Sequence, residues 1–235
     1  MADICRWMVE NDLKFNQDKT EFFLFHSKFR NGPSLKCIHI ENERIPIVTK
    51  ARNLGIIFDK FMSFDDQIIQ LCKSSLYHLR NLLRIRRYLT EKSASMVVDA
   101  FITSKLDHCN SLYFGLPKYQ VKRLQQLQNT SARFVTKAGK YDHITALLVE
   151  LRWLPVSFRI VFKLLLLVYK ILNGLSPSYL SNFVQYQTAT RSLRSNSQEL
   201  LIQPMAKTSG VLALVWQGRP TVNLAPPCLL QLRIY

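Results

Sequence analysis

Acidic residues are scarce in this sequence. Its 235 residues include 32 Lys or Arg but only 16 Asp or Glu, so the formal net charge at pH 7 is +16. Such a cationic excess favours a polyanionic partner, because long-range attraction and counterion release both increase with the number of cations presented. RNA, DNA or an RNA/DNA hybrid is therefore the expected partner, with an acidic membrane surface and a merely basic protein as alternatives.

Cysteine pairs and long apolar segments are also missing. The five cysteines are widely separated and form no C-x-x-C pair, which argues against a zinc site or a disulfide framework and favours a reducing compartment. The start, MADICRWMVEND, has no apolar core of a signal peptide. The most apolar run, residues 160–172, contains two lysines and is shorter than the roughly 20 residues that cross a bilayer. We expect an intracellular protein, cytoplasmic or nuclear, without a membrane partner.

Catalytic motifs are absent as well. The sequence has no H-E-x-x-H, G-x-S-x-G, Walker or dinucleotide-binding motif, so we expect no metal site, bound cofactor or small-molecule substrate. The adjacent carboxylates Asp65 and Asp66 follow Ser63, and we interpret them as a helix start, with Ser63 and Asp66 as the capping pair.

The apolar pattern predicts an α+β fold in three parts. Residues 1–62 are expected to hold one helix, over 3–14, and a small, mostly antiparallel sheet with strands at 20–26, a hairpin at 37–48 and a strand at 52–59. Residues 63–184 are expected to form a mainly α-helical bundle. Residues 185–235 are polar and then proline-broken, and we expect a poorly ordered tail.

Four helices are expected in the bundle. The first starts near Ser63 and is predicted to turn Ile68, Cys72, Leu76, Leu79 and Leu83 inward. The second starts near Thr90, ends before Asn110, and is predicted to bury Val97, Phe101 and Ser104. The third covers 118–137 and uses Val121, Leu124, Leu127 and Val135. The fourth, 156–172, is apolar nearly all round, so we expect it at the centre of the bundle, ending at Asn173-Gly174.

Basic residues concentrate in this helical part. Between Gln70 and Lys140 there are thirteen Lys or Arg against three Asp or Glu. Arg80, Arg84 and Arg87 in LRNLLRIRRYL are spaced to share one helix face, where forked guanidinium groups suit a phosphate backbone. The alternative is a solvated helix face. The predicted nucleic-acid-binding residues are Arg80, Arg84, Arg86, Arg87, Lys122 and Arg123.

Six stretches then suggest a family. They are WMVENDLKFNQDKTEFFLF, ARNLGIIFDKFMSFDDQI, YHLRNLLRIRRYLT, SKLDHCNSLYFGLP, LQQLQNTSARFV and HITALLVELRWLPVSFRIVFKLLLLVYKILNGLSPSYL, in this order from Trp7 to about Leu180. Together they resemble the reverse transcriptases of LINE-type retrotransposons, which lack long terminal repeats, particularly the jockey and chicken-repeat lineages.

The resemblance implies roles for several residues. Asn16 and Lys19 match the fourth palm motif, so Lys19 is the expected general acid toward departing pyrophosphate. Asn53, Leu54 and Gly55 match the strand that grips the primer end. The later helices correspond to the thumb and the region beyond it, which would hold the template–primer duplex. The 20 residues from Trp216 depart from the family pattern in register, as after a frameshift, so we place little weight on the sequence after Thr208.

The family's polymerase chemistry also needs Mg²⁺, held by carboxylates of an A-D-D motif that would precede Met1. We therefore expect a truncated, catalytically inactive reverse-transcriptase fragment that binds nucleic acid, itself without a cofactor. Missing upstream palm and fingers segments are the other implied partner. Two alternatives stay open: a clipped version of an active reverse transcriptase, and a decayed fragment without a selected function.

Overall fold

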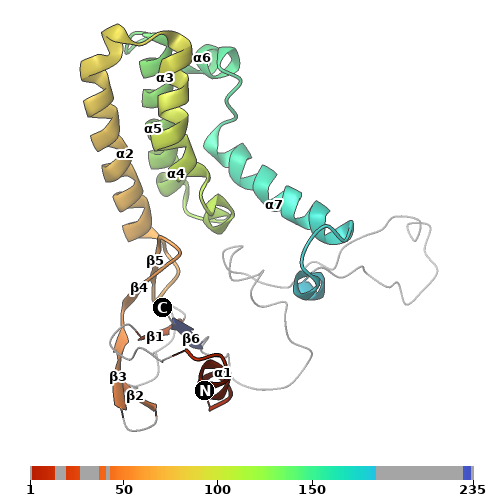
Figure 1. Ribbon diagram of the computed structural model, residues 1–235. Helices are drawn as coiled ribbons and strands as arrows, with labels where there is room; N and C mark the ends of the chain where they lie inside the picture. The colour runs from red at the N-terminus through yellow and green to blue at the C-terminus, as the bar shows by residue number, and fades with distance from the viewer. Residues whose placement is uncertain (1, 14–19, 27–36, 41–42, 184–229, 234–235) are drawn as a thin grey trace, which may run out of the picture. The chain divides into compact units, whose positions relative to one another are not determined.

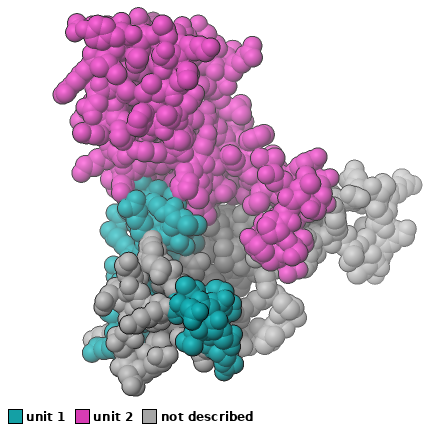
Figure 2. Space-filling model, in the orientation of Figure 1, with its two compact units in different colours: residues 1–67, 223–235 teal, residues 68–222 magenta. Residues whose placement is uncertain are grey.

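The computed structural model describes residues 2–13, 20–26, 37–40, 43–183 and 230–233 (Figure 1). The chain is an α+β protein, as predicted, and has two compact units. One comprises residues 1–67 with 223–235, and the other comprises residues 68–222 (Figure 2). The second boundary expected from the sequence, at 184/185, lies at the start of residues that the structure does not describe.

The first unit contains a four-stranded sheet in the order β2-β3-β1-β6. The predicted hairpin is confirmed: β2 (Cys37–Ile40) and β3 (Glu43–Val48) pair antiparallel, with Ile38 opposite Ile45. β1 (Glu21–Leu24) runs parallel to β3, and the core of this sheet is Phe22 and Ile45. β6 (Leu230–Arg233) pairs antiparallel with β1, so the expectation of an irregular segment through to residue 235 is wrong for these four residues.

The predicted strand at 52–59 is instead a second hairpin. β4 (Lys50–Asn53) and β5 (Ile56–Asp59) pair antiparallel, with Asn53 opposite Ile56. Leu54 and Gly55 form the turn between them and have positive φ angles of 47° and 84°. Two successive positive φ angles are typical of the tight turn that joins twisted antiparallel strands. Reading the segment as one continuous strand was wrong because it missed this turn.

Helix α1 (Ala2–Glu10) is confirmed as a helix but ends before the predicted Lys14. Asp12 has a positive φ of 55°, and the Leu13 amide donates to the Met8 carbonyl at 2.8 Å. A left-handed residue followed by this backward hydrogen bond is the usual way in which a helix C-terminus satisfies its last carbonyls.

Asp59 organises the passage from β5 to the first long helix. Its carboxylate accepts from the amides of Phe61, Ser63 and Phe64 at 2.9, 3.0 and 2.8 Å, and from the Ser63 hydroxyl at 2.9 Å. The Ser63 hydroxyl also lies 3.2 Å from Oδ2 of Asp65, and Asp66 pairs with Lys50 at 2.7 Å. The carboxylate that holds this turn thus comes from the preceding strand, and the pairing of Ser63 with Asp66 stays a prediction.

The second unit is helical, and the predicted helix positions are largely confirmed. Its elements, in chain order, are α2 (Asp65–Ile85, beginning in the first unit), a 3-10 turn (Arg86–Tyr88), α3 (Glu91–Val98), a π-helical segment (Asp99–Thr103), α4 (Ser104–Asp107), a 3-10 turn (Asn110–Tyr113), α5 (Lys118–Thr136), α6 (Ile144–Glu150), α7 (Val156–Leu172) and a 3-10 segment (Ser178–Phe183). The Thr90 hydroxyl caps α3 by accepting from the Ser93 amide at 3.1 Å, which explains the predicted start there.

The faces of two helices differ from the prediction. Cys72 of α2 is half-buried, and Leu76 and Leu83 are exposed; the buried residues of this helix are Gln67, Ile68, Leu71, Ser75, Leu79 and Leu82. From α3 to α4 the buried row is Ala94, Val98, Ile102 and Leu106, whereas Phe101 and Ser104 are exposed. A π-helical turn contains more residues than an α-helical turn, so residues four apart stay on the same side of the helix. The buried row therefore continues from Val98 to Ile102 and does not include Phe101, as it would in a regular α-helix.

The expected central place of 156–172 is also wrong. α7 packs against α5 and the 3-10 turn Asn110–Tyr113. Only Val156, Ile160 and Ile171 of α7 are buried. In Figure 1 the helix extends away from the end of the group formed by α2, α3 and α5. An apolar composition on all sides therefore did not identify a helix surrounded by others.

Candidate nucleic-acid interface

Two predicted arginines lie on the outer surface of α2. Arg80 and Arg84 are both exposed and stand one helical turn apart. Arg80 also follows Leu76 by one turn on the same side of the helix. Arg87 is exposed in the 3-10 turn that follows α2, with its guanidinium carbon 4.8 Å from the centre of the Tyr88 ring. These three side chains present permanent positive charge at the C-terminal end of α2.

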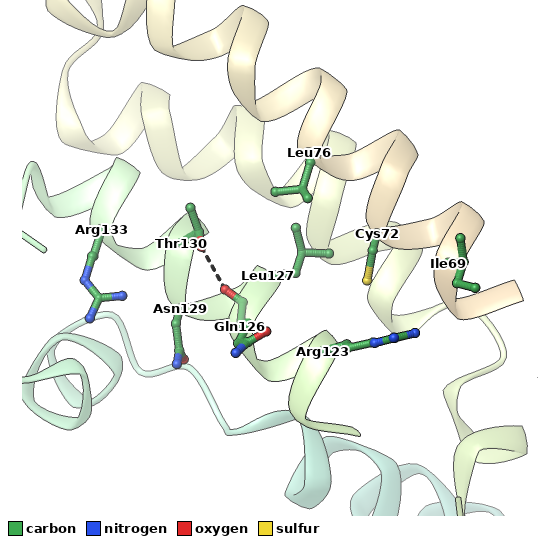
Figure 3. Close-up of a pocket in the computed structure, with 9 residues that line it drawn as sticks. All are labelled: Ile69, Cys72, Leu76, Arg123, Gln126, Leu127, Asn129, Thr130 and Arg133. Atoms are coloured by element: carbon green, nitrogen blue, oxygen red, sulfur yellow. Dashed lines mark hydrogen bonds between the residues drawn. The ribbon is translucent and has the colours of Figure 1, made fainter. Parts of the chain in front are cut away.

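The other predicted pair lies on α5. Lys122 and Arg123 are exposed in the second turn of this helix. The guanidinium carbon of Arg123 lies 5.8 Å from the centre of the Tyr119 ring, which restricts where the side chain points. Arg123 faces the N-terminal half of α2, next to Cys72 and Ile69 (Figure 3).

A shallow groove of about 690 Å³ separates α2 from α5. Its apolar lining comes from Ile69 and Leu76 of α2 and Leu127 of α5, together with the Cys72 thiol. Gln126, Asn129 and Thr130 of α5 add amide and hydroxyl groups, and arginines stand at both ends (Figure 3). The groove thus combines apolar contact, neutral hydrogen-bonding groups and positive charge. These groups suit a ligand with flat apolar rings and anionic groups.

Carboxylates are excluded from this surface. After its first turn α2 carries no Asp or Glu, and α5 carries none along its whole length. Among the described residues, the carboxylate salt bridges involve Lys50 with Asp66 and Arg159 with Asp107, so Arg80, Arg84, Lys122 and Arg123 form none. Their charge is therefore available to an anion from solution.

Cys72 reports the electrostatics of the groove. Burial raises the pKa of its thiol above the ordinary value of 9.0, and the positive charge of Arg123 acts in the opposite direction. Burial is the larger effect because it disfavours the thiolate. The thiol is therefore protonated at neutral pH and is a poor nucleophile.

Arg86 has a different role from the one predicted. Its side chain is only 8% exposed, and its Nε and one terminal nitrogen donate to the carbonyls of Phe134 and Val135. The other terminal nitrogen donates to the Leu89 carbonyl at 2.7 Å, and the guanidinium lies over the Phe134 ring. Arg86 therefore caps the C-terminal end of α5 from the interior. Its assignment to the nucleic-acid surface is wrong, because its donors already have backbone partners.

Arg133 is a groove residue that the sequence-based list omitted. It lines the end of the groove opposite Arg123 (Figure 3), and its Nε donates to the Gly139 carbonyl at 3.3 Å. Ten residues correspond to an offset of roughly 80° around an α-helix, so the spacing from Arg123 alone did not predict that both arginines would line one groove. Arg123 and Arg133 therefore supply the positive charge at the two ends of the groove, and the exposed Arg80, Arg84 and Arg87 continue along α2 and the turn after it, beyond Leu76.

The predicted primer-grip residues belong to the first unit, whereas the α2–α5 groove belongs to the second. Asn53, Leu54 and Gly55 lie at the tip of the β4–β5 hairpin in the first unit, where Leu54 is 80% exposed. They form a turn and not the continuous strand that the resemblance implied. Lys19 and Asn16 lie outside the described residues, so the predicted general acid has no structural placement.

The described residues do not fit the Mg²⁺ that the resemblance implies. Within them, no three His, Cys, Asp or Glu side chains gather closely enough to hold a metal ion. The adjacent carboxylates are engaged elsewhere, Asp65 with the Ser63 hydroxyl at 3.2 Å and Asp66 with Lys50. In the same part of the chain, no helix has the length and apolar character required to cross a bilayer.

Comparison with known proteins leaves the family undecided. No protein-family model, curated protein or solved structure matches the chain.

Proposed function

We propose that this chain derives from a LINE-type reverse transcriptase and binds RNA, DNA or an RNA/DNA duplex through phosphate contacts, without polymerase activity of its own. The observation that carries the binding proposal is the carboxylate-free surface of α2 and α5. Arg123 and Arg133 line the groove between the two helices, and Arg80, Arg84, Arg87 and Lys122 are exposed on these helices and on the turn that follows α2. Contacts of this kind neutralise phosphates whatever the base sequence, so binding is indifferent to sequence and weakens steeply with salt.

The geometry favours a polymer over a small anion. At a rise of 1.5 Å per residue, Cys72 and Arg84 are roughly 18 Å apart along the axis of α2. Arg123 lies beside Cys72, whereas Arg80 and Arg84 belong to the last turns of α2. A single phosphate reaches only one of these ends, whereas a nucleic-acid backbone of several nucleotides reaches both.

The test is a binding titration of the full chain with a fluorescent RNA/DNA duplex at low salt. The triple variant R80Q/R84Q/R87Q is expected to bind at least about tenfold more weakly, since each lost phosphate contact reduces counterion release. The matched control K92Q/K163Q/K170Q removes the same charge from exposed lysines outside this surface and should bind nearly as the parent does. Equal losses in both variants would mean that net charge alone attracts the duplex, and the proposed surface would be rejected.

Catalysis is tested separately by primer extension with Mg²⁺ and deoxynucleotides. We expect no extended product, because polymerase chemistry requires carboxylates that hold two metal ions, and the described residues offer no such set. Any template-dependent extension by the purified chain would refute the proposal that it lacks polymerase activity. The titration would still test the binding surface independently.

A further inference from the structure

The groove between α2 and α5 keeps its positive charge apart from its apolar lining. Arg123 and Arg133 stand at its two ends, and their positions on α5 are roughly 15 Å apart along the helix axis (Figure 3). Leu76 of α2 and Leu127 of α5 line the part between these ends, and Leu76 is 37% exposed. A phosphate placed on apolar surface loses hydration without gaining partners. The middle of the groove therefore suits a different part of a ligand from its ends.

Polar groups of the groove are available to that ligand. The Nε atom of Arg133 donates to the Gly139 carbonyl, and its two terminal nitrogens have no hydrogen-bond partner among the described residues. Within the same residues the Gln126 side-chain amide has no partner either, and Asn129 uses only its Oδ1, which accepts from Nε2 of Gln125 at 2.8 Å. Free amides of Asn and Gln offer a donor and an acceptor side by side, which match the edge of a nucleobase.

An aromatic ring extends the groove at the Arg123 end. Tyr119 precedes Arg123 by four residues on α5, and its ring is 52% exposed beside the Arg123 guanidinium. Around the helix, Tyr119 is offset by only roughly 20° from the groove residues Gln126 and Thr130. The ring therefore lies on the groove face of α5. Exposed aromatic rings beside cations are the surfaces on which unpaired bases stack.

We propose that the α2–α5 groove binds a single-stranded segment of RNA or DNA, with phosphates at Arg123 and Arg133 and an unpaired base against Leu76 and Leu127. The charge at the two ends complements the phosphates, and the apolar and amide groups between them complement the base. Bases inside a duplex are paired and stacked, so a duplex cannot cover the apolar part of the groove in this way.

This inference rests on the proposed function and narrows it. The exposed arginines at the end of α2 and on the following turn contact phosphates of any nucleic acid, whereas the groove favours an unpaired strand. The two surfaces therefore make different predictions for the ratio of single-strand affinity to duplex affinity.

The experiment titrates the full chain, at one low salt concentration, with fluorescent single strands of about 12 nucleotides and with the blunt duplex of the same sequence. RNA and DNA strands are both used, because the phosphates and base edges named here are common to the two polymers. We expect single strands to bind at least about fivefold more tightly than the duplex, since stacking and apolar contact add to the phosphate contacts.

Paired variants assign the preference to the groove. Leu76→Asn is expected to lower the ratio of single-strand affinity to duplex affinity by at least about fivefold, and Tyr119→Ala should lower it similarly. Leu83→Asn, at another exposed leucine of α2 that does not line the groove, and Tyr141→Ala, at a 90% exposed ring, are the matched controls and should leave the ratio unchanged. Circular dichroism shows that each variant is folded.

The outcomes separate this inference from the proposed function. Equal affinity for single strand and duplex, or a ratio that folded Leu76→Asn leaves unchanged, would overturn the inference while the phosphate-binding proposal stands. Failure of the parent chain to bind any strand or duplex would overturn the proposed function itself. A preference shown by RNA alone or by DNA alone would support the inference and identify the polymer that the groove binds.

Discussion

At the scale of single residues, neighbouring arginines with similar local sequence have opposite roles. In the run Arg86-Arg87 the first guanidinium is buried under the end of α5 and the second is exposed beside Tyr88. The spacing along the chain cannot separate them, because two of the three carbonyls that Arg86 binds belong to residues nearly fifty positions later. The exposed cations were predictable from sequence, whereas the buried one depends on a tertiary contact.

Replacing Arg86 should therefore destabilise the fold. Arg86→Gln leaves carbonyls of Phe134, Val135 and Leu89 without their donors, and unsatisfied buried groups of this kind cost about 2–4 kcal/mol in total. The free energy of unfolding, measured by urea titration followed by circular dichroism, should fall by that amount. Arg87→Gln is the matched control and should change it by less than about 0.5 kcal/mol. Similar losses in the two variants would contradict the capping role.

The Cys72 thiol gives a second prediction at this scale. Because burial raises its pKa, the rate of alkylation by iodoacetamide, followed by mass spectrometry of the Cys72 peptide, should reach half its maximum above pH 9.0. Arg123→Gln removes the charge that favours the thiolate, so the midpoint should move to still higher pH. Lys122→Gln serves as the control. A midpoint below 9.0, or one lowered by Arg123→Gln, would contradict this description of the groove.

At the scale of elements, helix ends were predictable and helix faces were less so. Thr90 and Asn173-Gly174 are local signals, and α3 begins and α7 ends beside them as expected. Faces depend on neighbours: α2 buries Ser75 and exposes Leu83, because its packed side is set by the helices it meets. The π-helical turn after Val98 changes which residues of the following segment face the interior, and no residue pattern in the sequence predicts this turn.

The loop between β5 and α2 supplies a prediction at this scale. Asp59→Ala removes the acceptor of three amide hydrogen bonds and one hydroxyl hydrogen bond in a half-buried turn. We expect the free energy of unfolding to fall by about 2–3 kcal/mol, since hydrogen bonds to a charged acceptor are stronger than neutral ones. Asp66→Ala, which removes only an exposed ion pair, should cost less than about 1 kcal/mol. The reverse order in urea denaturation would disprove the assigned role of Asp59.

At the scale of the whole molecule, the net charge of +16 is unevenly placed. The hairpin strand β3 and the start of α2 carry carboxylates, whereas α5 and the later turns of α2 carry none. The sequence could predict the excess of cations between residues 70 and 140. It could not predict that α2 and α5 border the same groove, because that depends on the fold of the intervening α3–α4 segment.

This distribution predicts how the parent and variants respond to salt. In a plot of log affinity against log salt concentration, each phosphate contact contributes a slope of roughly −0.9 on a duplex. R80Q/R84Q/R87Q should therefore make the slope shallower by about 2 to 3, and K122Q/R123Q by about 1 to 2, if each side chain meets one phosphate. K92Q/K163Q/K170Q should leave the slope nearly unchanged, because those lysines attract the duplex only at long range. If all three variants kept the slope of the parent, the duplex would be attracted by positive charge in general and not by contacts at a defined α2–α5 interface.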